Sequence, residues 1–341
     1  MARAGLNRKS ALATATLVLA AEAPDLDVVT ELRGNVFAFV HHRGISHTFV
    51  GVPMVAAFVV VVLWIYWRLR HRGESGSSTP QPRWGILFLL GCLAALTHIL
   101  LDFTNSYGVR PFMPFSYRWY SWDIVSIVEP VLWLILGLGL ILPMLSRLVE
   151  NEIGARRRTP RGRGAAIVAL SLVACFWMFR DYEHRRALAA MDSLTYQGLD
   201  ADRISAYPYT LNPFRWYGVV ETSAFFERLE VNSGTAEVDP RNEAQIRYKA
   251  EETPATLAAK KSYLGRAYLD WAQYPVTEVE QLSAPRSGYV VRFFDLRYLY
   301  PDSTHYPLSG WVQLDANLKV VAESAGGRNY PGRNTQADSR R

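Results

Sequence analysis

Long runs of apolar residues fill most of the first half of this sequence and are scarce after about residue 180. A helix needs roughly 20 apolar residues to cross about 30 Å of hydrocarbon. Residues 49–67, 84–103 and 125–145 meet this requirement, and residues 165–179 approach it beside a dense arginine cluster. The pattern therefore predicts a membrane-spanning α-helical bundle in this half of the chain.

A further apolar stretch, residues 10–24, is short and ends at a proline. It is compatible with a span, a re-entrant helix or one half of a hairpin. A cleaved signal peptide is disfavoured, because the acidic AEAPDLD follows where a small-residue cleavage site would be expected. We therefore expect four or five transmembrane helices in a domain formed by residues 1–180.

The second half of the sequence resembles a soluble protein. Residues 215–222, 288–300 and 310–323 alternate apolar and polar side chains as strands do, and residues 254–271 have one apolar face at helical spacing. We expect a small α+β domain, mainly antiparallel sheet, over residues 181–325. The tail at 326–341, rich in Gly, Arg, Asn and Ser, is expected to be disordered.

The distribution of arginine predicts how the bundle is oriented. The loops at 68–83 and 146–164 are rich in arginine and should be cytoplasmic, whereas those at 25–48 and 104–124 carry few and should face outward. Alternation then places the soluble domain outside the cytoplasm. Arg180, Arg185 and Arg186 oppose this orientation, although Asp181 and Glu183 are interleaved with them.

The formal net charge of +6 does not indicate a nucleic-acid partner, because the basic residues adjoin apolar runs and form no reading motif. Membrane lipids are the expected partners. Both cysteines, Cys92 and Cys175, lie in apolar runs, so a disulfide framework and a cysteine zinc site are both excluded. A metal ion in this chain has to be held by His and carboxylate side chains.

Ionisable residues at membrane depth are costly and mark functional sites. Two short motifs contain most of the histidines of the first half: HHRGISH precedes the second apolar run, and THILLDF ends the third. His98 and Asp102 are four residues apart, so on a helix they project from one face. Such a pair, taken alone, is equally well explained as a His that hydrogen-bonds its own Asp.

The predicted topology brings further polar residues to the same outer membrane surface. We therefore expect a metal cluster, with zinc the best fit and manganese or iron as alternatives. Arg43 could clamp an anionic group of a substrate or, equally, contact lipid headgroups. His184 and His305 are isolated and expected to be ordinary histidines. The candidate ligands are Asp25, Asp27, His42, His47, His98 and Asp102, with Asp123 beside them.

In their order along residues 10–145, the motifs APDLD, HRGISH, HILLD, SYG and PFSYRWYSWD resemble the YdjM-like family of LexA-regulated, membrane-bound proteins predicted to be metal-dependent hydrolases. The resemblance implies a multi-pass protein of the bacterial inner membrane. Glu129 stands where the family often has Asp. The family usually begins with a short THxxxG helix that carries another His, and this sequence starts just beyond that point.

These observations predict a hydrolase in which a metal-bound hydroxide attacks a carboxylic ester or phosphoester at the outer membrane surface. The substrate would be lipid-like, Asp27 or Asp123 would act as general base, and Arg43 would bind the substrate's anionic group. The alternative is a non-catalytic membrane protein with a structural or sensory metal and a partner-binding outer domain. A closed four-ligand site would favour that alternative, and an open coordination position would favour the enzyme. A transporter is disfavoured, because the polar residues gather at helix ends.

Overall fold

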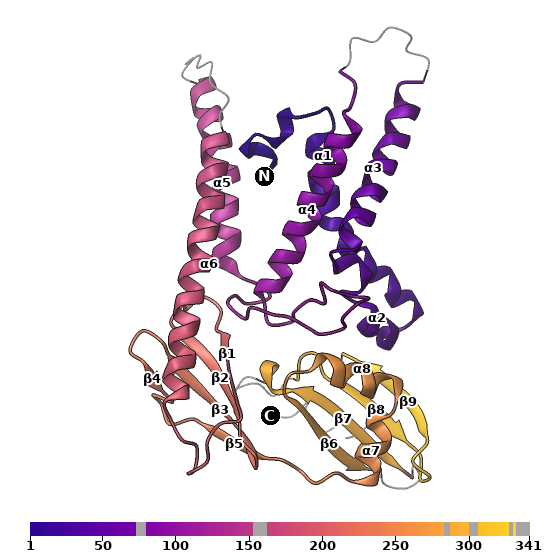
Figure 1. Ribbon diagram of the computed structural model, residues 1–341, viewed down its shortest axis with the longest axis vertical. Coiled ribbons are helices and arrows are strands. Elements are labelled where there is room, and N and C mark those ends of the chain that lie inside the picture. The colour runs from indigo at the N-terminus through magenta and orange to yellow at the C-terminus, as the bar shows by residue number, and fades with distance from the viewer. Residues whose placement is uncertain (73–79, 153–161, 283–286, 300–305, 327–329, 332–341) are drawn as a thin grey trace. The chain divides into compact units, whose positions relative to one another are not determined.

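The computed structural model describes residues 1–72, 80–152, 162–282, 287–299, 306–326 and 330–331 (Figure 1). His305, most of the predicted tail and the arginine-rich stretch 153–161 lie outside these residues. The chain divides into two compact units. The helical unit comprises Met1–Asp27, Arg43–Ala187 and Tyr207–Trp216, and the sheet unit comprises Val28–His42, Leu188–Ala206 and Tyr217–Arg341.

Two of the predicted spans form as expected. The apolar runs fold into α3 (Gly51–Arg70) and α4 (Trp84–Thr104), and both are long and apolar enough to cross a membrane. They pack closely, since a Cβ added at Gly91 of α4 would lie 3.0 Å from the Cβ of Ala56 on α3. Small residues at a helix contact let backbones approach in this way.

The first apolar stretch forms α1 (Ala13–Glu22), a helix of 10 residues. At 1.5 Å per residue it is about 15 Å long, half of a hydrocarbon core, so it is too short to be a span. Its residues Ala13, Leu17 and Ala20 are buried against α3 and α4. Short 3-10 helices, η1 (Ala2–Ala4) and η2 (Leu6–Arg8), precede it.

The last two apolar runs form α5 (Pro130–Glu152) and α6 (Arg163–Asp192). The predicted start of a span at residue 125 is wrong: Val125 donates its backbone N–H to Thr104 at 3.2 Å, and the helix begins at Pro130. Proline is favoured at a first helical position because it has no N–H to leave unbonded. The predicted span at 165–179 lies inside α6, which is 30 residues long and runs past residue 180.

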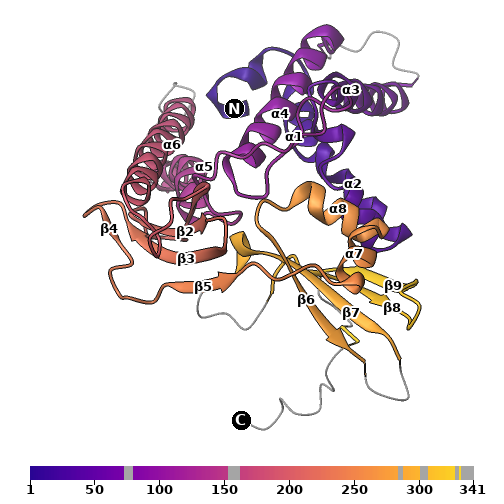
Figure 2. The ribbon, with the colours of Figure 1, turned by 60° about the horizontal axis from the view of Figure 1, so that its bottom comes forward.

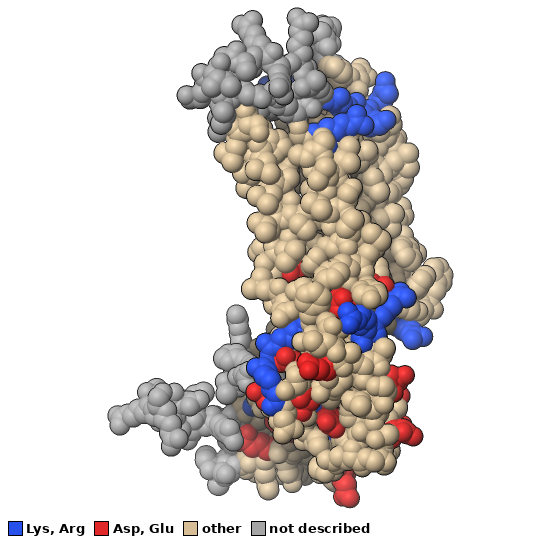
Figure 3. Space-filling view, turned by 90° about the vertical axis from the view of Figure 1, so that its left-hand side faces the viewer, with Lys and Arg blue, Asp and Glu red and all other residues tan. Residues whose placement is uncertain are grey.

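Three of these helices, α3, α4 and α6, are candidate membrane spans, and the apolar part of α5, Pro130–Ser146, is a shorter fourth among the described residues. Their outer faces are apolar. Figure 3 shows a broad face of the helical unit with almost no Lys, Arg, Asp or Glu. Close packing joins α5 to α6, since a Cβ at Gly139 would lie 2.6 Å from the Cβ of Ala169.

Two antiparallel sheets follow, as the sequence predicts in outline. The first contains β1 (Arg203–Pro208), β2 (Arg215–Glu221), β3 (Phe225–Asn232) and β4 (Glu237–Val238) in that order, with β5 (Gln245–Tyr248) also paired to β3. The second has the order β6 (Pro275–Gln281), β7 (Tyr289–Asp295), β8 (Gly310–Leu314), β9 (Val320–Ala325). A 3-10 turn, η5 (Leu296–Tyr298), follows β7.

Two predicted elements of this half are each divided in the structure. The helix expected over 254–271 is two helices, α7 (Pro254–Lys260) and α8 (Tyr263–Trp271), because Ser262 starts the second by accepting the Gly265 N–H at 2.9 Å. The strand expected over 310–323 is the β8–β9 hairpin. Its turn is held by Asp315, whose Oδ1 accepts the N–H groups of Asn317 and Lys319.

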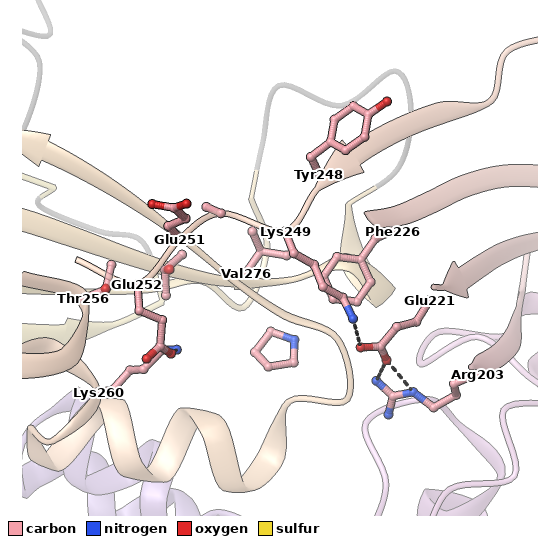
Figure 4. A pocket seen from close by; sticks show the side chains of 13 residues that line it. Arg203, Glu221, Phe226, Tyr248, Lys249, Glu251, Glu252, Thr256, Lys260 and Val276 are labelled. Carbon is pink, nitrogen blue, oxygen red and sulfur yellow. Dashed lines mark hydrogen bonds and ion pairs between the residues drawn. The ribbon is translucent and has the colours of Figure 1, made fainter. Parts of the chain in front are cut away.

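One open cleft of about 300 Å³ lies within the sheet unit, between the two sheets and α7 (Figure 4). Its cationic lining residues are paired with glutamates: Arg203 and Lys249 both contact Glu221, and Lys260 contacts Glu252. The lining charges therefore largely neutralise one another. No member of the metal cluster expected from the sequence lines this cleft.

Candidate metal centre

The end of α4 supplies two side chains to the site. His98 and Asp102 are four residues apart on the last turns of this helix, so they project from the same face as the sequence predicts. The helix ends at Thr104, whose hydroxyl donates to the Leu101 carbonyl at 2.6 Å. The Nε2 atom of His98 lies 3.4 Å from Asp102 Oδ2.

The turn before α3 supplies His47. It ends the 3-10 helix η4 (Ile45–His47), and its side chain is completely buried. Thr48 fixes this turn to α3, because its hydroxyl donates to the Ile45 carbonyl and accepts the Gly51 N–H, both at 2.8 Å. No side chain fits at Gly51, where a Cβ would lie 1.8 Å from the Ile45 carbonyl oxygen.

The fourth residue comes from η3 (Ala23–Arg33), the 3-10 helix that follows α1. Its first turn carries Asp25, whose Oδ1 lies 3.3 Å from Nε2 of His47 and 3.3 Å from Nε2 of His98. The side chain of Asp25 is 54% exposed, whereas those of His98 and Asp102 are 14% and 16% exposed. Asp25 is therefore the solvent-facing member of the group.

One atom from each of Asp25, His47, His98 and Asp102 lies within 4.8 Å of the other three. The two Nε2 atoms are 3.2 Å apart, and Nε2 of His47 is 3.3 Å from Asp102 Oδ2. With the three distances given above, five of the six separations among these atoms fall between 3.2 and 3.4 Å. The sixth, between the Asp25 and Asp102 carboxylates, is within 4.8 Å, so the four atoms form a roughly tetrahedral arrangement.

A tetrahedron of this size fits zinc. With Zn–N and Zn–O bonds of about 2.0–2.1 Å, ligand atoms at tetrahedral angles are about 3.3–3.4 Å apart. An octahedral magnesium ion with bonds of about the same length would instead place neighbouring ligands about 2.9 Å apart and opposite ones about 4.1 Å apart. Two imidazoles and two carboxylates are also donors that zinc accepts.

Asp102 provides a second feature that is compatible with a cation site. Its Oδ2 atom is buried and has no hydrogen bond of good geometry among the described residues, although two imidazole nitrogens lie beside it. A buried carboxylate oxygen left in this way costs about 1–3 kcal/mol or more. A bound metal ion would satisfy it.

The electrostatics of the group agree with such a site. Interaction with His47 and His98 holds the pKa of Asp25 far below its usual range, so Asp25 is ionised. Burial lowers the pKa of His47, but the carboxylates of Asp102 and Asp25 more than offset this and leave the pKa raised. A metal ion that binds here has to displace the proton that these carboxylates favour on His47.

Arg43 is buried beside the group. Its Nη2 donates to Asp102 Oδ1 at 2.7 Å, its Nη1 donates to the Gly108 carbonyl at 2.8 Å, and its guanidinium carbon lies 4.7 Å from the centre of the Tyr107 ring. The contact with Asp102 leaves Oδ2 facing the imidazoles. Asn105 also contacts Arg43 Nη1, at 3.5 Å, and accepts the Tyr107 N–H at 2.9 Å. Asn105 was not among the predicted site residues, and only its place directly before the SYG motif could have indicated a role.

Asp27 lies next to the group, not within it. Its Oδ2 accepts the Arg43 backbone N–H at 2.8 Å and is 3.6 Å from Nδ1 of His47, the ring nitrogen that faces away from the other ligands. Ser46 lies near the same nitrogen, with its Oγ at 3.1 Å. Outer carboxylates and hydroxyls in such positions orient metal-binding imidazoles.

Besides Asp27, two further predicted site residues, His42 and Asp123, are not brought into the four-residue group. His42 ends α2 (Asn35–His41) as its C-terminal cap and belongs to the sheet unit. Asp123 is held beside the end of α4 by its neighbours, since Trp122 donates to Phe103 and Ile124 donates to Thr104. Glu129 is buried before α5, where its Oε2 lies 3.4 Å from the Ser126 nitrogen. The roles expected for His42 and Asp123 remain predictions.

Comparison with known proteins covers both halves of the chain. Residues 254–330 match the YfhP C-terminal alpha/beta plait domain, which contains α7, α8 and strands β6–β9. The uncharacterized protein YfhP of Bacillus subtilis (strain 168) is 24% identical over 307 residues, which cover 89% of this chain and 82% of that protein. No solved structure matches the chain.

The helical half carries the stronger assignment. Residues 1–187, more than half of the chain, match the YdjM inner membrane protein family. This match includes all four residues of the tetrahedral group, together with Arg43 and Asp27. It also agrees with the apolar helices α3, α4 and α6. The chain belongs to the YdjM inner membrane protein family.

Proposed function

We propose that this protein is a zinc-dependent hydrolase that acts on a carboxylic ester or phosphoester at the membrane–water interface. The observation that carries the proposal is the asymmetry of the four-residue group. His47, His98 and Asp102 are largely buried, while Asp25 is 54% exposed. A reactant from solvent therefore reaches the group from the Asp25 side.

The residues divide into holding and assisting roles. Asp25, His47, His98 and Asp102 would hold the ion, which when bound would lower the pKa of a water molecule toward neutrality and polarise the substrate. Asp25 is the best-placed carboxylate to receive the proton of the attacking water, because its side chain is the one in the group that is open to solvent. Asp123 remains a second candidate for this role.

The contacts of two other predicted catalytic residues favour orienting roles. Arg43 is buried with its guanidinium on Asp102 and Gly108, so it would fix the Asp102 carboxylate and not bind a substrate anion. Asp27 would orient His47 through the Nδ1 side of the ring. Manganese or iron would meet the same donors, but the tetrahedral spacing favours zinc.

Apolar side chains near the ligands support a lipid-like substrate. Leu26 lies between Asp25 and Asp27, Ile45 begins the turn that carries His47, and Phe49 follows it. All three are exposed in the helical unit. Apolar surface at the end of membrane helices would admit an acyl chain while Asp25 faces the polar headgroup.

A specific observation also favours a second candidate, a structural or sensory metal site. The protein supplies four donors at tetrahedral spacing, as closed structural zinc sites do. In the enzyme, Asp25 would have to give up its place, or the coordination would have to expand to five. The two functions therefore differ in whether the exposed Asp25 carboxylate stays bound as one of only four ligands.

Asp25→Asn should separate them by experiment. The amide is nearly the same size and cannot accept the proton, so we expect hydrolysis of a chromogenic phosphodiester or short-chain ester in detergent to fall by about 10²–10⁴-fold. The three buried ligands should still retain zinc at a substoichiometric level that elemental mass spectrometry measures. Wild-type protein that carries zinc but hydrolyses neither ester class would leave only the structural or sensory function.

We also propose that the sheet unit lies outside the cytoplasm, from the arginine distribution in the loops. A reporter fused after Pro80 should therefore give a cytoplasmic signal, and reporters fused after Arg118 and after Asn232 should give an exterior signal. The Arg118 fusion is the internal control, since it depends on α3 and α4 alone. A cytoplasmic signal after Asn232 would mean that α5 and α6 do not both cross.

A further inference from the structure

The chain leaves the helical unit and returns to it between the ligands. Residues Val28–His42 belong to the sheet unit, whereas Asp25 and Asp27 before them and Arg43 and His47 after them belong to the helical unit. This excursion is short, and both of its ends reach the tetrahedral group within a few residues. Any contact that holds α2, in the middle of this segment, is therefore connected to the four-residue group through a few residues of backbone at each end.

The outer part is held by the plait domain. The excursion contains α2, which packs on α8 and β9 within the sheet unit (Figure 2). Phe39 of α2 stacks on Tyr268 with ring centres 5.7 Å apart and meets the edge of Trp271 at 5.5 Å. Asn35 adds hydrogen bonds from Nδ2 to Ser324 Oγ and to the Ala325 carbonyl, at 2.6 and 2.9 Å.

The inner ends are held in the helical unit. The Arg43 backbone N–H donates to Asp27 Oδ2 at 2.8 Å and so closes the base of the excursion. On the outgoing side, η3 runs unbroken from Asp25 to Arg33, and only Gly34 separates it from α2. On the returning side, three residues, 42–44, separate α2 from η4 and His47.

We propose that Phe39 is a positioning residue for the metal site, which gives the plait domain the role of holding the ligand-bearing segments in place. Anchoring α2 on α8 and β9 orders the segment that joins Asp25 to His47, and so limits the conformations open to the two short ends that carry these ligands. The inference rests on the proposed metal site. Phe39 touches none of the four ligands, so its effect on metal binding would be transmitted through these two short segments.

Phe39→Ala removes the ring that contacts Tyr268 and Trp271. We expect the affinity of the whole 341-residue protein for Zn²⁺, measured in detergent by competition with a chromogenic chelator, to fall about 10-fold, the lower end of what supporting residues contribute. Co²⁺ substitution gives a second readout. The visible absorption of tetrahedral Co²⁺ should weaken as the geometry loosens, which a loss of overall stability alone would not produce.

Phe37→Ala is the matched control, because it removes an aromatic ring from the same helix. The Phe37 ring stacks on His41 at 3.8 Å and lies under Arg33 at 5.3 Å, both within the excursion. We expect it to leave Zn²⁺ affinity near the wild-type value, and we expect Phe39→Tyr, which keeps the ring, to do the same. Asn35→Ala tests the same anchor independently should Phe39→Ala fail to fold.

The outcomes separate this inference from the proposed function. Wild-type protein that binds no metal would overturn both. Wild-type protein that binds Zn²⁺, together with folded Phe39→Ala and Asn35→Ala variants of unchanged affinity and unchanged Co²⁺ spectrum, would overturn the positioning role alone. An equal loss of affinity in Phe37→Ala would also overturn it, since the effect would then belong to α2 in general.

Discussion

His98→Ala and His47→Ala should each abolish stoichiometric zinc binding. Either change removes one of four donors and leaves Asp102 Oδ2, already without a well-directed hydrogen bond, facing a smaller cluster. Supporting residues alone contribute about 10–100-fold to metal affinity, so the loss of a direct ligand should exceed 100-fold. Elemental mass spectrometry of protein purified without chelator, together with chelator competition, measures both content and affinity.

Two other histidines serve as controls for the loss of an imidazole. His41 is exposed six residues before His47 and contacts the Phe37 carbonyl through Nδ1 at 2.9 Å. His184 lies on α6, with its ring 5.1 Å from that of Trp216. His41→Ala and His184→Ala should keep one zinc ion per chain. If folded His47→Ala and His98→Ala proteins also keep it, the tetrahedral group is not the metal site.

The membrane part of the fold was predictable where one local property decides it. Apolar run length alone located α3 and α4, because crossing the bilayer imposes a minimum length. It failed at residue 125, where the backbone bonds back to Thr104 at the end of α4. That pairing joins segments about 20 residues apart, and the amino-acid composition of either segment does not indicate it.

In the second half of the chain, the predicted helix over 254–271 and the predicted strand over 310–323 are each divided in two. The divisions follow from Ser262 and Asp315, which form a helix cap and a turn. A periodic pattern of apolar residues does not reveal these roles.

The candidate site was predictable to a similar extent. The pairing of His98 with Asp102 follows from helix geometry, and alternating spans bring Asp25 and His47 to the same surface. Why His47 joins the group while His42 does not depends on the turn after α2, where Arg43 has a φ of 52°. The sequence could not show that Arg43 is held by Gly108, because that contact depends on how the loop after α4 returns.

Gly51→Ala should remove zinc without altering any ligand. The new Cβ would lie 1.8 Å from the Ile45 carbonyl oxygen, and real Cβ contacts are essentially never below 3.0 Å. The backbone must therefore separate by about 1.2 Å, and the obstructing atom cannot rotate away. Since Ile45 and His47 share the turn η4, His47 would move with it, whereas metal–ligand distances tolerate only about 0.2 Å.

Gly85→Ala is the matched control, because Gly85 also lies in the first turn of a membrane helix but has nothing within 4 Å of the added Cβ. It should keep full zinc content and, by helix propensity, should stabilise α4 by up to about 1 kcal/mol. Both variants are compared by zinc content and by thermal unfolding in detergent. We expect Gly51→Ala to remain folded with at least a 100-fold loss of zinc affinity, well beyond the usual effect of a supporting residue of about 10–100-fold. Zinc content in Gly51→Ala equal to that in Gly85→Ala would show that the position of η4, and with it His47, does not control metal binding.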